Sequence, residues 1–276
     1  MKNKKILLKI LLVVLFVVMF VPLWFMFVGS MQNLNGVMRM PPKLFPYPFF
    51  LNNYLSFLDY PLMTWFKNTV WSLFVMVVIS VFISSSTGYF FATTNFKFKE
   101  VFFAILLIGM LMPRISFLIP QYIILKKIHL SGMLIGVVLS SAYTSYGILL
   151  ARNYFESIPK SLFEAAAIDG ANDWDILFHI VLPITPPAIA TLALSTSIFY
   201  LSDFIWQMLV LQNDKNMTLL IGMIKTTMQI QFSGSNGINP LGRMMAVGII
   251  LLIPLVIIFL IANKYFTSSR GGEIKE

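Results

Sequence analysis

The stretch ILLVVLFVVMFVPLWFMFV, residues 10–28, contains no charged side chain and decides the class of this protein. Its 19 residues form a helix of about 28 Å at about 1.5 Å of rise per residue, which matches the hydrocarbon core of a bilayer. The lysines before it resemble the basic start of a signal peptide. Signal peptides, however, carry apolar segments of about 7–15 residues and a small-residue cleavage site, and no such site follows here. We therefore expect a retained spanning helix.

Composition extends this prediction to the whole chain. Of the 276 residues, 58% are hydrophobic and 11% are charged, and the mean hydropathy is +0.83. Soluble proteins carry about 25% charged residues, so this chain has too few charges to cover a water-exposed surface. The net charge of +9 does not indicate nucleic-acid binding, because the basic residues lie at the ends of apolar runs. With no cysteine and two histidines, the sequence predicts no disulfide and no Cys/His metal site.

Five further apolar runs are long enough to cross a bilayer. They cover residues 68–93, 101–121, 132–154, 180–210 and 244–266. We therefore predict an all-α polytopic membrane protein with six transmembrane helices and both termini on one side of the membrane.

Basic residues orient these spans. Cytoplasmic termini place eleven Lys and Arg residues inside and eight outside, the latter including Lys225 and Arg243. This difference agrees with the positive-inside rule, and the N-terminal lysine cluster points the same way. The expected organisation has three parts. They are a first spanning helix with a long extracytoplasmic segment (1–67), a transmembrane core (68–266) and a cytoplasmic tail (267–276).

One cytoplasmic connection, IPKSLFEAAAIDGANDWDILFHIVLP at residues 158–183, has the pattern of two short helices. Pro159 suits a first helical turn, and Ser161 and Glu164 have the spacing of a capping box. Leu162, Phe163 and Ala166 fall near one face of this first helix. A small-sided helix of this kind can lie in a groove on another protein.

The end of the first helix and the start of the second are also marked. Gly170 supplies a left-handed stop, since glycine adopts positive φ without steric cost. Asn172 or Asp173 can then cap a second helix that runs toward Pro183.

The pattern EAAAIDGA at residues 164–171, followed by I-x-LP at 180–183, resembles the EAA loop of ABC importer permeases. The surrounding residues are similar to the MalG-like permeases of carbohydrate importers. Agreement extends to WFKNT at 65–69, GYFFATTNFKFK at 88–99, LMPRISFLIPQY at 111–122 and AVGIILLIPLVIIF at 246–259. The resemblance implies a type I ABC importer permease fold whose EAA loop is a cytoplasmic coupling helix.

The same resemblance implies partners and contact residues. The partners are a second, MalF-like permease, a dimer of ABC ATPases, an extracytoplasmic solute-binding protein and the lipid bilayer, with no nucleic acid. The residues implied to contact the ATPase are Leu162, Phe163, Glu164, Ala165, Ala166, Asp169 and Gly170.

This chain has no sequence signal for binding ATP itself. A P-loop ends in Gly-Lys-Ser or Gly-Lys-Thr, and none of the fifteen glycines is followed by lysine. We therefore expect a transport subunit rather than an enzyme, without a cofactor or metal of its own. ATP and magnesium would be bound by the partner ATPase.

Polar side chains in the fourth and fifth spans are candidates for the substrate pathway, because sugars bind through hydrogen bonds and ring stacking. They are Tyr143, Thr144, Tyr146, Ser195, Tyr200, Asp203 and Gln207. Hydroxyl groups also join membrane helices, so each has a packing alternative. Arg114, between Pro113 and Pro120, can line the cavity or bind the carbonyls that a broken helix frees. Residues 84–87 before Gly88 favour close helix packing.

The predicted function is the import of a carbohydrate, an oligosaccharide in particular, driven by ATP hydrolysis in trans. An importer of a sugar phosphate or an anionic saccharide is the alternative within transport. A polytopic membrane enzyme is the alternative outside it, and would need an acidic or histidine cluster at a membrane face. The only acidic cluster lies in the EAA-like loop.

Overall fold

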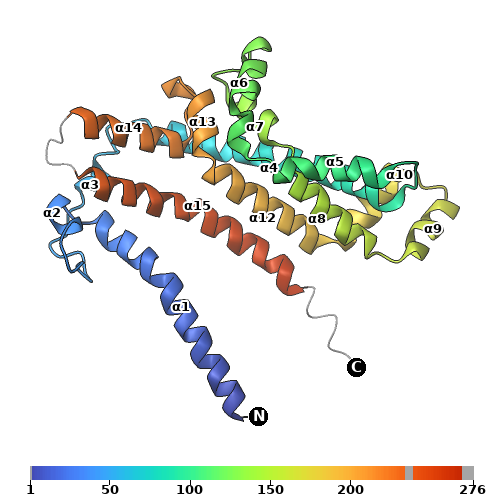
Figure 1. Ribbon diagram of the computed structural model, residues 1–276, viewed down its shortest axis with the longest axis horizontal. Helices are drawn as coiled ribbons and strands as arrows, with labels where there is room; N and C mark the ends of the chain where they lie inside the picture. Colours follow the sequence, from blue (N-terminus) through green and yellow to red (C-terminus); the bar gives the residue numbers. More distant parts are fainter. Residues whose placement is uncertain (1, 234–238, 269–276) are drawn as a thin grey trace. The chain divides into compact units, whose positions relative to one another are not determined.

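The computed structural model describes residues 2–233 and 239–268, and over this part of the chain it contains helices and no strand (Figure 1). The described chain divides into two compact units. Unit 1 comprises residues 1–65 and 219–253, and unit 2 comprises residues 66–218 and 254–276. The expected tail, residues 267–276, lies outside the described residues except for the last two positions of the final helix.

Unit 1 contains α1 (Lys2–Ser30), α2 (Leu34–Val37), α3 (Asn52–Leu55), α14 (Leu219–Ser233), the first turn of α4 (Leu62–Thr93) and the first half of α15 (Pro240–Ser268). Unit 2 holds the remainder of α4 and α15, with α5 (Lys99–Leu111), η1 (Arg114–Phe117), α6 (Leu118–Lys127), α7 (Leu134–Ser141), α8 (Ser145–Glu156) and α9 (Lys160–Ile168). It continues through α10 (Asp173–Asp175), the π-helical η2 (Ile176–Val181), α11 (Leu182–Ile184), α12 (Pro186–Ser202), α13 (Phe204–Val210) and η3 (Asp214–Asn216).

The helices provide up to six spans, as many as the six predicted, if each of three bent helix pairs counts as one span. Within the described residues, Lys5–Ser30, Leu62–Thr93 and Pro240–Tyr265 are single helices long and apolar enough to cross a membrane. The other three are bent pairs. They are Lys99–Leu111 with Arg114–Lys127 (98°), Leu134–Ser141 with Ser145–Glu156 (50°) and Asp173–Ile184 with Pro186–Ser202 (88°).

Local sequence explains each bend. Pro113 follows the end of α5 and has no N–H to continue the helical ladder. Thr144 caps α8, because its Oγ1 accepts a hydrogen bond from the Gly147 N–H at 3.2 Å. Pro186 and Pro187 occupy the first positions of α12, where proline is favoured and the preceding helix cannot continue.

Unit 1 contains two features that the sequence did not indicate. The expected outer connection contains α14, an apolar helix shorter than a span. The hydroxyls of Thr226 and Thr227 bond carbonyls one turn earlier, so they need no water. Arg243, expected outside, lies within α15 and is 0% exposed. Its guanidinium lies 4.0 Å from the Phe57 ring centroid and donates to Thr226 Oγ1.

The small residues of α4 pack closely against α8, as expected: a Cβ on Gly147 of α8 would lie 2.5 Å from Ser84 Oγ. A Cβ on Gly88 would lie 2.6 Å from Ala151 Cβ and 2.8 Å from the Arg152 nitrogen on α8. Ser80 and Thr196 share a buried hydrogen bond between α4 and α12. α8 in turn packs against α5 and α12 (Figure 1). These contacts bring the bent helices together around α4.

Candidate functional site

The EAA-like loop folds as two helical segments joined at a glycine, as its sequence indicates. Gly170 has φ +81° and provides the predicted left-handed turn between α9 and α10. Asn172 caps α10, with its side-chain oxygen accepting from the Trp174 and Asp175 amides at 3.0 Å. The Asp175 carboxylate accepts from the Asn172 amide, which completes a capping box. The second segment then continues through η2 and α11 to Ile184.

The predicted capping box of the first helix is wrong. α9 begins after Pro159, and no side chain caps it. Glu164 therefore lies inside the helix, with its side chain exposed, rather than bonded to its N-terminus. The reason is that the helix begins at Lys160, with Pro159 at the N-cap position, so Ser161 lies at the second helical position and cannot act as the N-cap.

α9 has an inner and an outer face. Phe163 and Ala166 pack against the core of unit 2, where the Phe163 ring lies 6.2 Å from that of Tyr89 on α4. Phe163 and Ala166 therefore hold α9 against the core of unit 2. The predicted contact residues that remain exposed are Leu162, Glu164, Ala165, Asp169 and Gly170. Ile168, which the sequence analysis passed over, is 86% exposed and belongs to the same outer surface.

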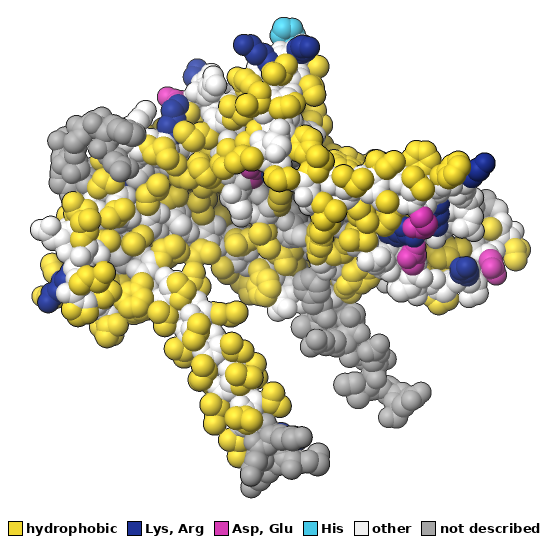
Figure 2. Space-filling model, viewed as in Figure 1, with side chains coloured by type: hydrophobic (Ala, Val, Ile, Leu, Met, Phe, Trp, Pro, Cys, Tyr) yellow, Lys and Arg dark blue, Asp and Glu magenta, His cyan; other side chains and the backbone are white. Residues whose placement is uncertain are grey.

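Charged residues surround this end of unit 2 (Figure 2). Arg152 on α8 pairs with Glu100 on α5 at 2.8 Å and with Glu156 one turn later at 2.7 Å. Its guanidinium also lies 4.1 Å from the Phe103 ring centroid. No local motif in the sequence indicates this network, because 52 residues separate Arg152 from Glu100. The network ties α5 to α8 next to α9.

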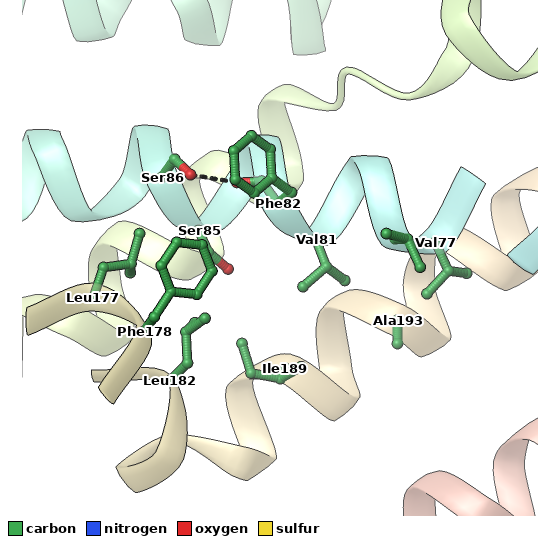
Figure 3. Close-up of a pocket in the computed structure, with 11 residues that line it drawn as sticks. Val77, Val81, Phe82, Ser85, Ser86, Leu177, Phe178, Leu182, Ile189 and Ala193 are labelled. Carbon is green, nitrogen blue, oxygen red and sulfur yellow. Dashed lines mark hydrogen bonds between the residues drawn. The ribbon is translucent and has the colours of Figure 1, made fainter. Parts of the chain in front are cut away.

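An apolar groove of about 370 Å³ lies between α4, η2, α11 and α12 (Figure 3). Val81 and Phe82 line it from α4, Phe178 from η2 and Ile189 from α12. The Phe82, Trp174 and Phe178 rings stack on one another with centroids 6.0–6.4 Å apart. The groove offers apolar contact and few polar groups, so it does not fit a sugar.

A second cavity in unit 2, of about 430 Å³, has the polar character that a sugar requires. Hydroxyls, an amide and aromatic rings line it together with one charged residue, Arg114. The lining includes Gln121, Ser140, Ser141, Tyr143, Thr144, Tyr146, Ser195, Thr196 and Phe199.

Arg114 joins three helix breaks at this cavity. It lies directly after the break between α5 and η1, and its guanidinium forms a 2.8 Å ion pair with Asp203, at the break between α12 and α13. It donates to Ser141 Oγ, at the end of α7, at 3.1 Å, and lies 4.3 Å from the Phe199 ring centroid. Among the described residues, Arg114 therefore contacts side chains. It does not bind backbone carbonyls that a broken helix leaves free among these residues, which was one of the two roles considered from the sequence.

The predicted pathway residues have three different positions in the structure. Tyr143, Thr144, Tyr146 and Ser195 line the polar cavity. Tyr200 and Gln207 are buried instead. Tyr200 donates to Ser72 Oγ, while Gln207 donates to the Tyr200 carbonyl and accepts from Thr218. Asp203 reaches the cavity only through its ion pair with Arg114. Tyr200 and Gln207 thus form hydrogen bonds within unit 2 and line neither the polar cavity nor the apolar groove.

Known proteins share this organisation. The family described as "Binding-protein-dependent transport system inner membrane component" matches residues 84–270, which include the EAA-like loop and the polar cavity. The arabinooligosaccharides transport system permease protein AraQ of Halalkalibacterium halodurans is 31% identical over 74% of this chain and 70% of its own length. The melibiose/raffinose/stachyose import permease protein MelC of Bacillus subtilis is 29% identical over 76% and 75%.

A solved structure is similar to the fold as a whole. A chain of a bacterial ABC transporter involved in the import of the acidic polysaccharide alginate matches with a TM-score of 0.78 and 26% identity. The match covers 96% of this chain and 97% of that chain.

Proposed function

Since this chain belongs to the family of binding-protein-dependent transport system inner membrane components, we propose that it imports a carbohydrate, an oligosaccharide in particular. It is a multi-pass membrane permease subunit of an ABC importer. The relatives named for arabinooligosaccharides and for melibiose, raffinose and stachyose support the class of substrate. The lining of the polar cavity, rich in hydroxyls and aromatic rings, supports it independently.

The observation that carries the coupling proposal is the outer face of α9. Leu162 and Ile168 are exposed there without a covering segment among the described residues, while Phe163 and Ala166 hold the helix on unit 2. We infer that a groove on a separate ATPase covers this face, with Glu164 and Asp169 contacting basic residues of that partner. ATP and magnesium would then be bound by the ATPase dimer, and this chain would need no cofactor. A cytoplasmic α9 would also put both termini in the cytoplasm.

Three partners complete this proposal. A second, MalF-like permease would close the polar cavity from the opposite side. The ATPase dimer would move α9, and the motion would reach the cavity through η2 and α12, which are continuous with the loop. An extracytoplasmic binding protein would deliver the sugar.

An anionic saccharide is the second candidate substrate, because Arg114 lines the cavity. The related alginate importer supports this class as well. Against it, the ion pair with Asp203 already balances the charge of Arg114. We therefore place uncharged oligosaccharides first.

The test is to purify the tagged chain with its partners and measure ATP hydrolysis. Candidate binding proteins would be added with neutral oligosaccharides or with uronic acid oligomers. We expect an ATPase and a second permease to co-purify, and neutral sugars to stimulate hydrolysis. Recovery of the chain alone, in a detergent that keeps a known importer assembled, would reject the importer assembly. Stimulation by uronic acid oligomers alone would select the second candidate.

A further inference from the structure

The segment that follows the first spanning helix folds back along it. We call residues 38–50 the boundary lobe. The Trp24 indole N–H donates to the Leu44 carbonyl at 3.0 Å, and its ring meets Phe45 edge-on with centroids 6.0 Å apart. The Phe50 amide donates to the Met31 carbonyl, just beyond the end of α1. Trp24 precedes Ser30 by six residues, about 9 Å along the helix axis, so the lobe lies beside the last turns of the span.

The boundary lobe exposes apolar side chains in numbers that water does not favour. Six large apolar residues are exposed, namely Met38, Met40, Leu44, Phe45, Tyr47 and Phe49. Aromatic and apolar side chains at the end of a spanning helix are typical of the boundary between hydrocarbon and headgroups. A lobe beside the end of a spanning helix would lie among lipid headgroups on either side of the membrane.

A pocket of about 290 Å³ opens between this lobe and α2. Its lining residues include two cations, Arg39 and Lys43, and no acid. The Lys43 ammonium donates to the Tyr47 carbonyl at 2.8 Å, which fixes its position. Arg39 is exposed and has no hydrogen bond or ion pair with the described residues. Asp59 is the only acidic residue in the sequence of unit 1, and it does not line the pocket.

The pocket also contains a buried hydrogen-bond donor without a partner. Gln32 is 5% exposed, lines the pocket, and its Nε2 donates to no atom of the described residues. Its backbone is fixed, because the Asn53 and Asn239 amides both donate to the Gln32 carbonyl. A buried donor left unpaired costs free energy that an acceptor oxygen would recover.

From these observations we propose that the pocket binds the phosphate of an anionic phospholipid headgroup. Arg39 and Lys43 would hold the phosphate oxygens, and the apolar residues of the boundary lobe would contact the upper part of the acyl chains. The lipid would fasten the start of the loop to the bilayer at the end of α1. An acidic segment of a protein partner offers similar charge but would not explain the exposed apolar side chains around the pocket.

The test is a titration of the full importer complex, after lipid depletion, with phosphatidylglycerol or phosphatidylcholine, with bound lipid counted by native mass spectrometry. The variant is Arg39→Gln with Lys43→Gln. The matched control is Lys126→Gln with Lys127→Gln, which removes two exposed charges at the end of α6. We expect the variant to bind phosphatidylglycerol about thirtyfold more weakly, since each basic side chain near an anionic surface contributes about fivefold. The control and phosphatidylcholine binding should not change.

Each other outcome rejects the proposal. Equal lipid binding by the variant and the control rejects the site. Displacement by millimolar inorganic phosphate without a preference among lipids identifies a free-anion site instead. Loss of stimulation by the binding protein, with lipid binding unchanged, identifies a docking surface for an acidic protein. A double Arg39→Lys, Lys43→Arg variant changes both side chains but keeps both charges. It should bind phosphatidylglycerol as the wild type does, which would show that substitution at these positions does not by itself disrupt the pocket.

Discussion

The polar cavity and the apolar groove occupy the same unit and have similar volumes, about 430 and 370 Å³, yet they differ in chemistry. The polar cavity lies where helices break, at the α5–η1, α7–α8 and α12–α13 junctions. The groove is lined by the continuous helix α4 and by η2, α11 and α12 on both sides of the 88° bend between α11 and α12. Helix breaks free backbone groups that need polar partners. Near this bend the Thr185 hydroxyl donates to the Val181 carbonyl at 2.7 Å, whereas at the polar cavity side chains from three junctions meet.

This comparison suggests that the polar cavity and the apolar groove have different roles within unit 2. The polar cavity fits a hydrated solute, and the groove provides an apolar contact at the EAA-like loop. The two regions are connected, because η2, which belongs to this loop, lines the groove and α12 lines both the groove and the cavity. The following predictions test whether the two regions are functionally distinct.

The largest effect should come from Arg114→Met, which leaves the Asp203 carboxylate without its ion pair at the polar cavity. Breaking one side of a fully buried pair costs about 3–5 kcal/mol, but the Arg114 side chain is 34% exposed, so solvent screens this pair and we expect about 2 kcal/mol. Thermal unfolding followed by tryptophan fluorescence measures the loss. The double variant Arg114→Met, Asp203→Leu should recover most of it. Unchanged stability of the single variant would mean that Arg114 does not hold the three breaks together.

Gly170→Val should come next, because valine at φ +81° is strained by about 1–3 kcal/mol. We expect the loop to rearrange and uptake to fall at least tenfold, while ATP hydrolysis by the complex continues without stimulation. Gly170→Asn is the matched control, since asparagine tolerates this conformation. No atom lies within 4 Å of a Cβ at Gly170, so a steric clash does not explain a difference between the two variants. Normal uptake by the valine variant would remove Gly170 from the coupling route.

Phe178→Ala should have a smaller effect, confined to stability. It removes one ring from the stack with Phe82 and Trp174, which we expect to cost about 1 kcal/mol. Half-saturation for uptake should not change, because the groove does not contact the solute in our proposal. A change in sugar specificity, measured by competition between oligosaccharides, would contradict the separation of the two regions.

The smallest effect should come from a matched pair of serine variants, one in each region. Ser195→Ala removes a hydroxyl from the polar cavity, and we expect a two- to tenfold rise in the sugar concentration for half-maximal uptake, about 1 kcal/mol. Ser85→Ala removes a buried groove hydroxyl that bonds none of the described residues, so stability should stay equal or rise slightly. Equal transport by both variants would show that Ser195 does not contact the solute.

Much of this protein was predictable from sequence alone because it depends on neighbouring residues. Length and hydropathy determine the apolar runs, and the conformational freedom of glycine determines the turn at Gly170. Asn172 caps its helix because its side chain reaches an amide only three residues away. The EAA-like pattern also lies within one short segment of the chain, so the sequence alone indicated both the loop and the family resemblance.

Tertiary structure decided what depends on residues far apart in the chain. Arg114 and Asp203 are 89 positions apart, and only the meeting of three helix breaks makes them an ion pair and assigns Arg114 to the cavity. The burial of Arg243 also depends on residues far apart in the chain. Its guanidinium contacts the Phe57 ring and donates to Thr226 within unit 1. Tyr200 and Gln207 have side chains that are suited to binding sugar, but in the fold these side chains form hydrogen bonds with neighbouring residues. A residue's type limits the contacts it can make, and only the fold determines which of those contacts it makes.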